Sequence, residues 1–381
     1  MFSFTEEQSS IRDMIRAFAE KEIRPIAEEI DKTGRFPKET IAQLADMGVM
    51  GLNIPEEYGG AGMDEICKVL AISEVSRCCA STAEILAVHL LVNDIILHQA
   101  SEEQKEYWLP RACEGKLGAF CLTEPGAGSD AGGLRTKAVQ DGDDYILNGT
   151  KVFISNFGKD EGDHFVIIAL TDPDKGTKGG MTAFLVGRDT PGLSLGKTED
   201  KMGMRGAAVS ELILEDCRVS KNTIMGKVGD GFKVAMSGLD GGRIGIAAQA
   251  FGLAQAALEE AVKYSSERIQ FGKPINTNQG LQWYLADMVT RTEAARLLTL
   301  EAAALRMKGE PCSKNASMAK YYSAETACYV CDLALQIHGG YGYMKDYPIE
   351  RMYRDARIMR IYEGTSEVQK IVISRAVIKG K

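Results

Sequence analysis

Apolar residues recur at spacings of three and four through the first part of the chain, and this period predicts helices up to about residue 118. The first apolar stripe consists of Ile11, Met14, Ile15, Phe18, Ile23 and Ile26. A hydroxyl residue followed three positions later by Glu or Gln predicts helix starts at Thr5, Ser81 and Ser101. Pro37 can open another helix that stops at Gly48. The glycines between 59 and 62 predict a turn, because no strand precedes them and no P-loop lysine follows.

Near residue 119 the pattern changes to short apolar segments separated by turn residues, which is typical of strands. Asp141-Gly142 and Asn148-Gly149 are both hairpin signals. The predicted strands are Tyr145 to Leu147, Val152 to Ile154, Phe165 to Leu170, Met181 to Val186, Leu193 to Leu195 and Val209 to Leu214. Short strands with glycine-rich turns predict a small antiparallel barrel or sandwich of about a hundred residues.

The helical period returns at Asp230 and continues to the end of the chain. It is clearest over Leu281, Leu285, Met288, Thr292, Ala295, Leu298, Ala302 and Leu305, and again from Ala316 to Ile337. We therefore predict an α+β protein with three domains. These are an N-terminal α-helical domain (1–118), a middle antiparallel β domain (119–229) and a C-terminal α-helical bundle (230–381).

Composition narrows the possible partners. The 381 residues carry a net charge of -8 with both signs interspersed, which argues against nucleic acid because no basic face is concentrated. No basic and apolar leader begins at Met1, and the best apolar run, Phe165 to Leu170, is too short to span a membrane. Nine irregularly spaced cysteines suggest reduced thiols, so we expect a cytoplasmic protein.

No metal site is predicted from the four histidines or from the cysteines. His89 and His98 fall on one predicted helix but are not three or four residues apart, and the other two histidines are distant in sequence. Cys328 and Cys331 form a C-x-x-C pair inside a helical pattern, with no second pair. We interpret this pair as structural rather than metal-binding or redox-active.

The segment from Ile361 to Glu367 carries the strongest candidate chemistry. Glu363 precedes Gly364, and Thr365 or Ser366 can cap a helix that begins there. The backbone N–H groups of such a helix start suit a phosphate or a developing oxyanion, and glycine lets a ligand approach them. Glu363 is then a general base beside a cofactor or, in the simpler interpretation, a solvated glutamate in an ordinary helix cap.

Three further segments combine glycines with polar or aromatic residues. Residues 120–130 contain Thr123, Ser129 and the two glycines Gly126 and Gly128 at the end of a predicted strand, a set suited to a flavin edge and a pyrophosphate. Residues 268–274 end one predicted helix with basic and aromatic side chains, and residues 336–342 end another. Each segment alone is a weak signal, because a glycine after a helix is usually only a C-cap.

Together, and in this order across an α-β-α layout, the four segments resemble the acyl-CoA dehydrogenase family of flavoproteins over nearly the whole chain. The short-chain, butyryl-CoA type is the most similar. The resemblance implies that fold, with a C-terminal four-helix bundle, and FAD as cofactor. It also implies an oligomer, normally a dimer of dimers, because some of the FAD-binding residues act across a subunit boundary.

The resemblance assigns FAD-binding roles residue by residue. Near the flavin and its pyrophosphate it implies Phe120, Leu122, Thr123, Gly128, Ser129, Phe153 and Ser155. Ser155 matches the hydroxyl near flavin N5, and Phe153 stands where many relatives have tryptophan. The residues that act across the subunit boundary are Arg268, Phe271, Gln336 and Gly340, and the last cofactor contacts are Thr365 and Glu367.

The catalytic base of the family maps onto Glu363. A minority of relatives carry the base at the position of Gly242, and glycine cannot take a proton. Ser129, Asp240, Arg243 and Gly364 are then expected at the acyl-CoA. As unpaired surface charges Asp240 and Arg243 would have no special role.

Several functions are compatible with these residues. The first is dehydrogenation of a short-chain acyl-CoA, with electrons passed to an electron-transferring flavoprotein. The second is the reverse reaction, an enoyl-CoA reductase supplied by a possibly bifurcating electron-transferring flavoprotein. The third is a non-catalytic flavin-binding scaffold, which the intact Glu363 and cofactor segments disfavour. An acyl-CoA oxidase is a further alternative, although those relatives are usually much longer.

Overall fold

Helices make up the start of the chain in this computed structural model, which describes residues 3–380. They are α1 (Glu6–Phe18), α2 (Ala27–Thr33), α3 (Lys38–Asp46), α4 (Glu65–Cys78), α5 (Ala80–Gln99) and α6 (Glu102–Cys113). A π-helical turn (Ala19–Ile23) and a 3₁₀ turn (Arg24–Ile26) connect α1 to α2. The capping boxes predicted at Thr5 and Ser101 are confirmed, and α3 follows Pro37 as expected.

The capping box predicted at Ser81 is wrong. Helix α5 begins at Ala80, and its N-cap residue Cys79, two residues before Ser81, makes no side-chain capping bond. Glu84 is buried and accepts a hydrogen bond from Ser155 instead of returning to the helix start. The local capping pattern is overridden here because α5 follows α4 with almost no connection and is buried along nearly its whole length.

The middle of the chain forms an eight-stranded sheet. Its strands are β1 (Gly118–Cys121), β2 (Lys137–Asp141), β3 (Asp144–Ser155), β4 (His164–Leu170), β5 (Met181–Gly187), β6 (Leu193–Thr198), β7 (Val209–Ser220) and β8 (Ile224–Met225). The order is β6-β7-β3-β2-β4-β5-β8, with β1 paired to β4. The pairs are antiparallel except those of β4 with β1 and β2. The predicted antiparallel domain is thus confirmed as a mostly antiparallel sheet.

One of the two hairpin signals is confirmed and the other is wrong. Asp141 and Gly142 form the turn between β2 and β3. Asn148 and Gly149 lie inside β3, where the pairing with β7 shifts register. The glycine is needed there because a Cβ would come within 2.5 Å of Thr136 Oγ1. Asn-Gly therefore marks a β-bulge in one long strand rather than a turn.

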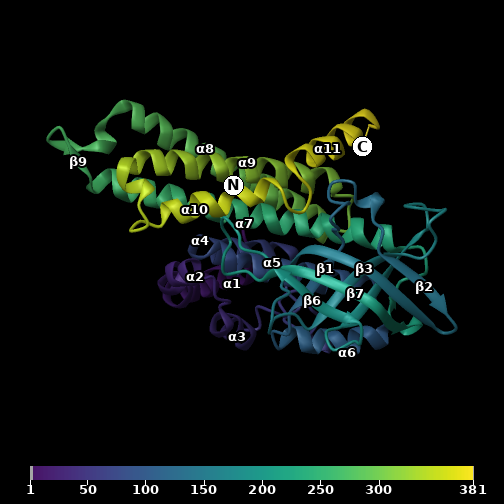
Figure 1. The fold of residues 1–381 in the computed structure, drawn as a ribbon. Coiled ribbons are helices and arrows are strands. Elements are labelled where there is room, and N and C mark those ends of the chain that lie inside the picture. Colours follow the sequence, from purple (N-terminus) through teal and green to yellow (C-terminus); the bar gives the residue numbers. More distant parts are fainter. Residues whose placement is uncertain (1–2, 381) are drawn as a thin grey trace.

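The C-terminal part is a bundle of long helices that lies along the N-terminal helices (Figure 1). Its helices are α7 (Gly231–Glu267), α8 (Gln279–Met307), α9 (Ser313–His338), α10 (Ile349–Ala356) and α11 (Ser366–Ile378). A two-stranded hairpin, β9 (Ile269–Gln270) and β10 (Lys273–Pro274), follows α7 at the opposite end of the molecule from the sheet (Figure 1).

Helix α7 is the central element, because it packs on α9 and α8 of its own bundle and on α4 and α5 of the N-terminal helices. Small residues let these helices approach closely. A Cβ at Gly238 would lie 2.6 Å from Ile95 of α5, so a larger residue would push the two helices apart. The contact between α5 and α7 forms one wall of the site described below.

Helix α5 also corrects the prediction that Phe165 to Leu170 is the best apolar run. Among the described residues it is the one helix long and apolar enough to span a membrane by length and composition. In the structure 89% of its apolar window is buried inside the protein. This burial is the behaviour of a core helix, whose apolar side chains are covered by neighbouring elements.

Candidate active site

Glu363 and Gly364 form a tight turn immediately before α11. Both residues have positive φ, 53° for Glu363 and 91° for Gly364. Thr365 caps α11 by accepting a hydrogen bond from the backbone of Val368 at 3.3 Å, so the predicted helix start is confirmed. A positive φ is strained for glutamate and costs about 1–3 kcal/mol, so neighbouring contacts must hold this turn.

The Glu363 carboxylate points into the interior. Its Oε2 atom is buried and has no hydrogen-bond partner among the described residues. A Cβ placed on Gly242 of α7 would lie 2.6 Å from Oε2 and 3.4 Å from Leu91 of α5. The absence of a side chain at Gly242 therefore gives the carboxylate the space that it occupies against α7. Burial raises the pKa of Glu363 to about 7, while nearby Arg243 and Lys320 oppose this rise.

Arg243 and Asp240 lie one turn apart on α7 and form an ion pair. Arg243 Nη1 donates to Asp240 Oδ1 at 2.7 Å, and Arg243 is 5% exposed. The alternative that these residues are unpaired surface charges is therefore wrong. Arg243 Nε is buried and has no partner within residues 3–380, so the guanidinium still has a donor to offer near the Glu363 turn.

A buried lysine joins two of the predicted cofactor segments. Lys151 of β3 donates from Nζ to the Leu122 carbonyl at 3.1 Å and to Glu124 Oε1 at 2.7 Å. The backbone N–H of Val152 also donates to the Thr123 carbonyl at 2.9 Å. The loop after β1 and the end of β3, which are about thirty residues apart in sequence, are thereby fixed against each other.

The outer side of this junction is open and carries an aromatic ring. Phe153 has a φ of 58°, and its side chain is 65% exposed. Gly126, Gly128 and Ser129 are exposed, and a Cβ on either glycine would meet nothing within 4 Å. The loop thus presents backbone and a hydroxyl, and the end of β3 presents an aromatic ring, to a volume that the protein itself does not fill.

Ser155 connects this surface to the wall that Glu363 faces. Its Oγ donates to Glu84 Oε1 of α5 at 2.8 Å. Leu91, which borders the space at Gly242, lies seven residues further along α5. Two helical turns span about 10 Å on one face, so Glu84, which holds Ser155, and Leu91 lie on the same side of α5 about that far apart.

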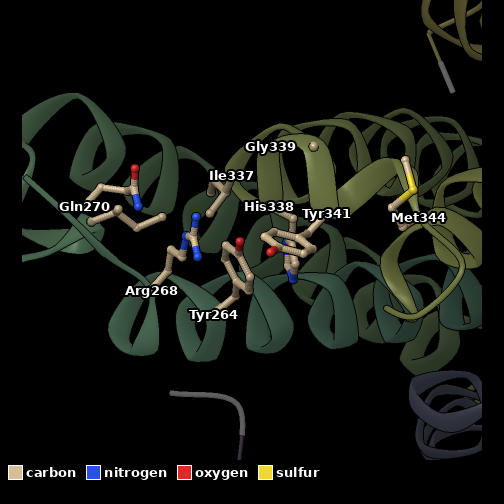
Figure 2. A pocket seen from close by; sticks show the side chains of 10 residues that line it. Tyr264, Arg268, Gln270, Ile337, His338, Gly339, Tyr341 and Met344 are labelled. Atoms are coloured by element: carbon tan, nitrogen blue, oxygen red, sulfur yellow. The ribbon is translucent and has the colours of Figure 1, made fainter.

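A second set of predicted residues lies far from Glu363. Arg268 and Gly340 line a pocket of about 410 Å³ between the ends of α7 and α9. Figure 2 shows Arg268, Tyr264 and Tyr341 gathered there, with the Arg268 guanidinium 5.3 Å from the Tyr341 ring centre. Gln336 is exposed nearby, and Phe271 is 98% exposed on the β9–β10 hairpin.

Helix length separates these two regions. Arg268 follows Gly242 by 26 residues along α7, which corresponds to roughly 40 Å. Within one chain the structure brings together the segments around Leu122 and Ser155, connects them through α5 to Glu363, and leaves Arg268, Phe271, Gln336 and Gly340 at the opposite end. A single ligand cannot touch both regions of one chain.

Comparison with known proteins identifies this arrangement. The chain matches the sequence models for the N-terminal, middle and C-terminal domains of acyl-CoA dehydrogenase over residues 5–116, 119–217 and 229–378. The chain belongs to the acyl-CoA dehydrogenase family. It is similar to acryloyl-CoA reductase (NADH) of Anaerotignum propionicum, with 53% identity over 99% of this chain and 96% of that protein.

Solved acyl-CoA dehydrogenase structures share the whole fold. Butyryl-CoA dehydrogenase from Megasphaera elsdenii has a TM-score of 0.96 and 43% identity, over 99% of this chain and all of that one. A chain in a structure described as an electron transferring flavoprotein of Acidaminococcus fermentans, studied for flavin-based electron bifurcation, has a TM-score of 0.97 and 47% identity. That match covers 100% of both chains.

Acyl-CoA dehydrogenases depend on FAD, and the residues present here fit a flavin. The ring of Phe153 and the open backbone around Gly128 offer a stacking surface and donors to a planar, phosphate-bearing group. Glu363 Oε2, which has no partner among the described residues, lies against Gly242 of α7. The site therefore offers donors and a carboxylate that suit an acyl group lying against a flavin.

Sequence reasoning missed four buried polar residues of this acyl-CoA dehydrogenase site: Glu84, Lys151, Lys320 and Gln369. Lys320 donates a hydrogen bond to the Gly364 carbonyl, and Gln369 donates to the carbonyls of Glu363 and Gly364. A signal for Lys320 does exist in the sequence, since it is a lone charge in the apolar stripe between Ala316 and Ile337. The partners of Glu84, Lys151 and Lys320 come from distant segments, and spacing along the chain does not reveal them. Gln369 bonds to residues five and six positions earlier in the chain.

Proposed function

We propose that this protein catalyses the FAD-dependent α,β-dehydrogenation of a short-chain acyl-CoA to the trans-2-enoyl-CoA, with Glu363 as the base. The observation that supports this proposal is the buried Oε2 atom of Glu363, which has no hydrogen-bond partner among the described residues and lies against Gly242 of α7. Burial that raises the pKa of Glu363 to about 7 makes it a stronger base than an ordinary glutamate, yet one still ionised near neutral pH.

The α-proton of a thioester is very weakly acidic, so a base must be held against it in the right orientation. Glu363 accepts that proton at Oε2, in a setting that excludes water from the atom. FAD, when bound, supplies the acceptor for the hydride that leaves the β-carbon. Arg243, with Asp240, Ser129 and the Gly364 backbone, would orient the acyl-CoA, and the free Nε of Arg243 is available for that purpose.

The residues proposed to hold FAD come from two copies of the chain. One copy would contribute Phe120, Leu122, Thr123, Gly128, Ser129, Phe153 and Ser155, together with Thr365 and Glu367. The other would contribute Arg268, Phe271, Gln336 and Gly340, which lie too far away to reach the same cofactor within one chain. The 98% exposure of Phe271 supports such an assembly, because a fully exposed phenyl ring gains from a partner surface.

We propose a dimer of dimers for this assembly and assign the three predicted domains as its folding units. Acyl-CoA is the substrate, and an electron-transferring flavoprotein is the proposed redox partner, in line with the structure from Acidaminococcus fermentans described above. The net charge of -8 and the burial of α5 are in keeping with a soluble protein, and we propose that it works in the cytoplasm.

The reverse reaction is a second candidate, favoured by the relative that is named acryloyl-CoA reductase. In that direction Glu363 returns a proton to the α-carbon of an enoyl-CoA while a hydride is added at the β-carbon. The same residues serve both directions, because a base and its conjugate acid occupy one position. Electron supply from a bifurcating electron-transferring flavoprotein would set the direction.

Anaerobic titration of the yellow holoprotein with butyryl-CoA, followed at the flavin absorbance band, tests the proposal. The wild type should bleach, whereas Glu363→Gln should retain FAD and bind acyl-CoA but bleach at least 1,000-fold more slowly, about 4 kcal/mol in barrier. Glu28→Gln, at an exposed glutamate of α2, is the matched control and should behave as wild type. Normal bleaching of Glu363→Gln would overturn the proposed role.

A further inference from the structure

Lys320 is a fully buried lysine on α9, directly behind the Glu363 turn. Its Nζ donates to the Gly364 carbonyl oxygen at 2.7 Å. No carboxylate forms an ion pair with Lys320 within residues 3–380. A buried ammonium group without a carboxylate partner is expensive to keep charged, and burial accordingly lowers the pKa of Lys320 to about 8.

Gln369 of α11 holds the same turn without carrying a charge. Its Nε2 donates to the Glu363 carbonyl at 3.0 Å and to the Gly364 carbonyl at 2.9 Å. Because each peptide unit is planar, these two bonds fix the peptide planes on both sides of Gly364, and the first of these planes is attached to the Cα atom of Glu363. Two side chains therefore aim the carboxylate, one cationic and one neutral.

Two cations lie near the Glu363 carboxylate, and Lys320 is the one of them that has no ion-pair partner among the described residues. Glu363 faces Arg243 from α7 and Lys320 from α9. Arg243 is already paired with Asp240 at 2.7 Å. Lys320 itself faces Glu363, Arg243, Glu325 and Glu367; Glu325 is paired with Arg360 at 2.8 Å, and Glu367 is exposed.

We propose that Lys320 is a positioning residue for Glu363, which holds the strained Glu363–Gly364 turn in place and supplies, beside Arg243, a second buried positive charge near the carboxylate. The inference rests on the proposed function, since it concerns the base of that reaction. Gln369 contributes to the geometry of the turn but not to its charge. The two residues are thus a natural matched pair for an experiment.

The experiment compares the pH dependence of flavin bleaching by butyryl-CoA in holoprotein variants. A base acts in its deprotonated form, so the rate rises with pH through the pKa of Glu363. Lys320→Met removes the cation, and the rising limb should move up by about one pH unit. Its rate at pH 7 should also fall by about tenfold or more, since the turn loosens.

Two further variants separate the effect of the Lys320 charge from the effect of the hydrogen bonds that hold the turn. Lys320→Gln keeps a donor but loses the charge, and its rising limb should move as in Lys320→Met. Gln369→Met weakens the turn without changing the charge, so it should lower the rate and leave the limb at the wild-type pH. Rates are divided by the folded fraction measured at each pH, so partial unfolding of a variant does not obscure the position of the limb.

An unmoved limb in both Lys320 variants would overturn the inference, as would an equal movement in Gln369→Met. Glu363→Gln distinguishes failure of the proposed function from failure of the role given to Lys320. If Glu363→Gln bleaches normally, the proposed function itself fails. If Glu363→Gln is inactive while the Lys320 variants keep the wild-type limb, Glu363 is the base and Lys320 alone loses its role.

Discussion

Glu363 holds an ionisable side chain in surroundings that oppose its charge. Its pKa is raised from 4.5 to about 7, so keeping it ionised at pH 8 costs about 3 kcal/mol of folding stability. The folded protein binds more protons than the unfolded chain between these two pKa values. The contribution of Glu363 to stability is therefore greatest below pH 4.5, and it is lost as pH rises through 7.

Glu363→Gln should for this reason be more stable than the wild type at alkaline pH. We expect its melting temperature to exceed that of the wild type by about 4 °C at pH 8 and to differ little at pH 5. Calorimetry of both holoproteins at the two pH values measures this. A constant difference between pH 5 and pH 8 would show that the carboxylate is not held in the buried position described here.

Elements are joined at the predicted flavin site by one buried ion pair. Lys151 of β3 is fully buried and holds Leu122 and Glu124 of the loop after β1. Lys151→Met should cost about 3–5 kcal/mol, because it leaves the buried Glu124 carboxylate without its cation. It should also release FAD, since the loop and the strand end are no longer fixed together. Melting temperature and the ratio of flavin to protein absorbance measure both effects.

A surface pair provides the control for Lys151. Lys221, just after β7, pairs at 2.8 Å with Asp143 in the turn between β2 and β3, and both residues are exposed. Lys221→Met should leave both the melting temperature and the FAD content nearly unchanged, because water screens such a pair. Adding Glu124→Gln to Lys151→Met should recover part of the stability. Equal losses from the exposed and buried lysines would contradict the role given to Lys151.

At the scale of the whole molecule, the end that carries β9 and the pocket at Arg268 is the proposed contact with a second copy (Figure 1, Figure 2). If a second copy completes each FAD site there, Phe271→Ala should weaken FAD binding by about tenfold or more without lowering the stability of the isolated fold. The phenyl ring makes no core contact within its own chain, being 98% exposed. FAD titration of the apoprotein and light scattering measure affinity and assembly.

Tyr107→Ala is a suitable comparison for Phe271→Ala, since Tyr107 is an aromatic residue of α6 that is 58% exposed at a different surface. It should alter neither FAD affinity nor oligomeric mass. A protein that is monomeric with full FAD affinity would contradict the two-copy site, because Arg268 and Phe271 could then not reach the cofactor.

Local patterns were sufficient wherever neighbours in sequence determine the structure. The capping boxes at Thr5 and Ser101, the cap at Thr365 and the turn at Gly142 depend on contacts within a few residues, and all are confirmed. Ser81 and Asn148 carried equally good local signals and were misread. Packing between α4 and α5 and the pairing of β3 with β7 decided those two positions.

The sequence by itself determined the order of helices and strands and, through the family resemblance, which carboxylate to examine, because periodicity and motif spacing are properties of the chain. Only the tertiary structure decided what surrounds Glu363. Gly242 and Lys320 come from two other helices, and they meet the turn because α7 packs on α9 and α9 packs on α11; Gln369 reaches back to the turn from the start of α11. Burial and charge at one atom depend on all of these neighbours at once, and no stretch of sequence contains them.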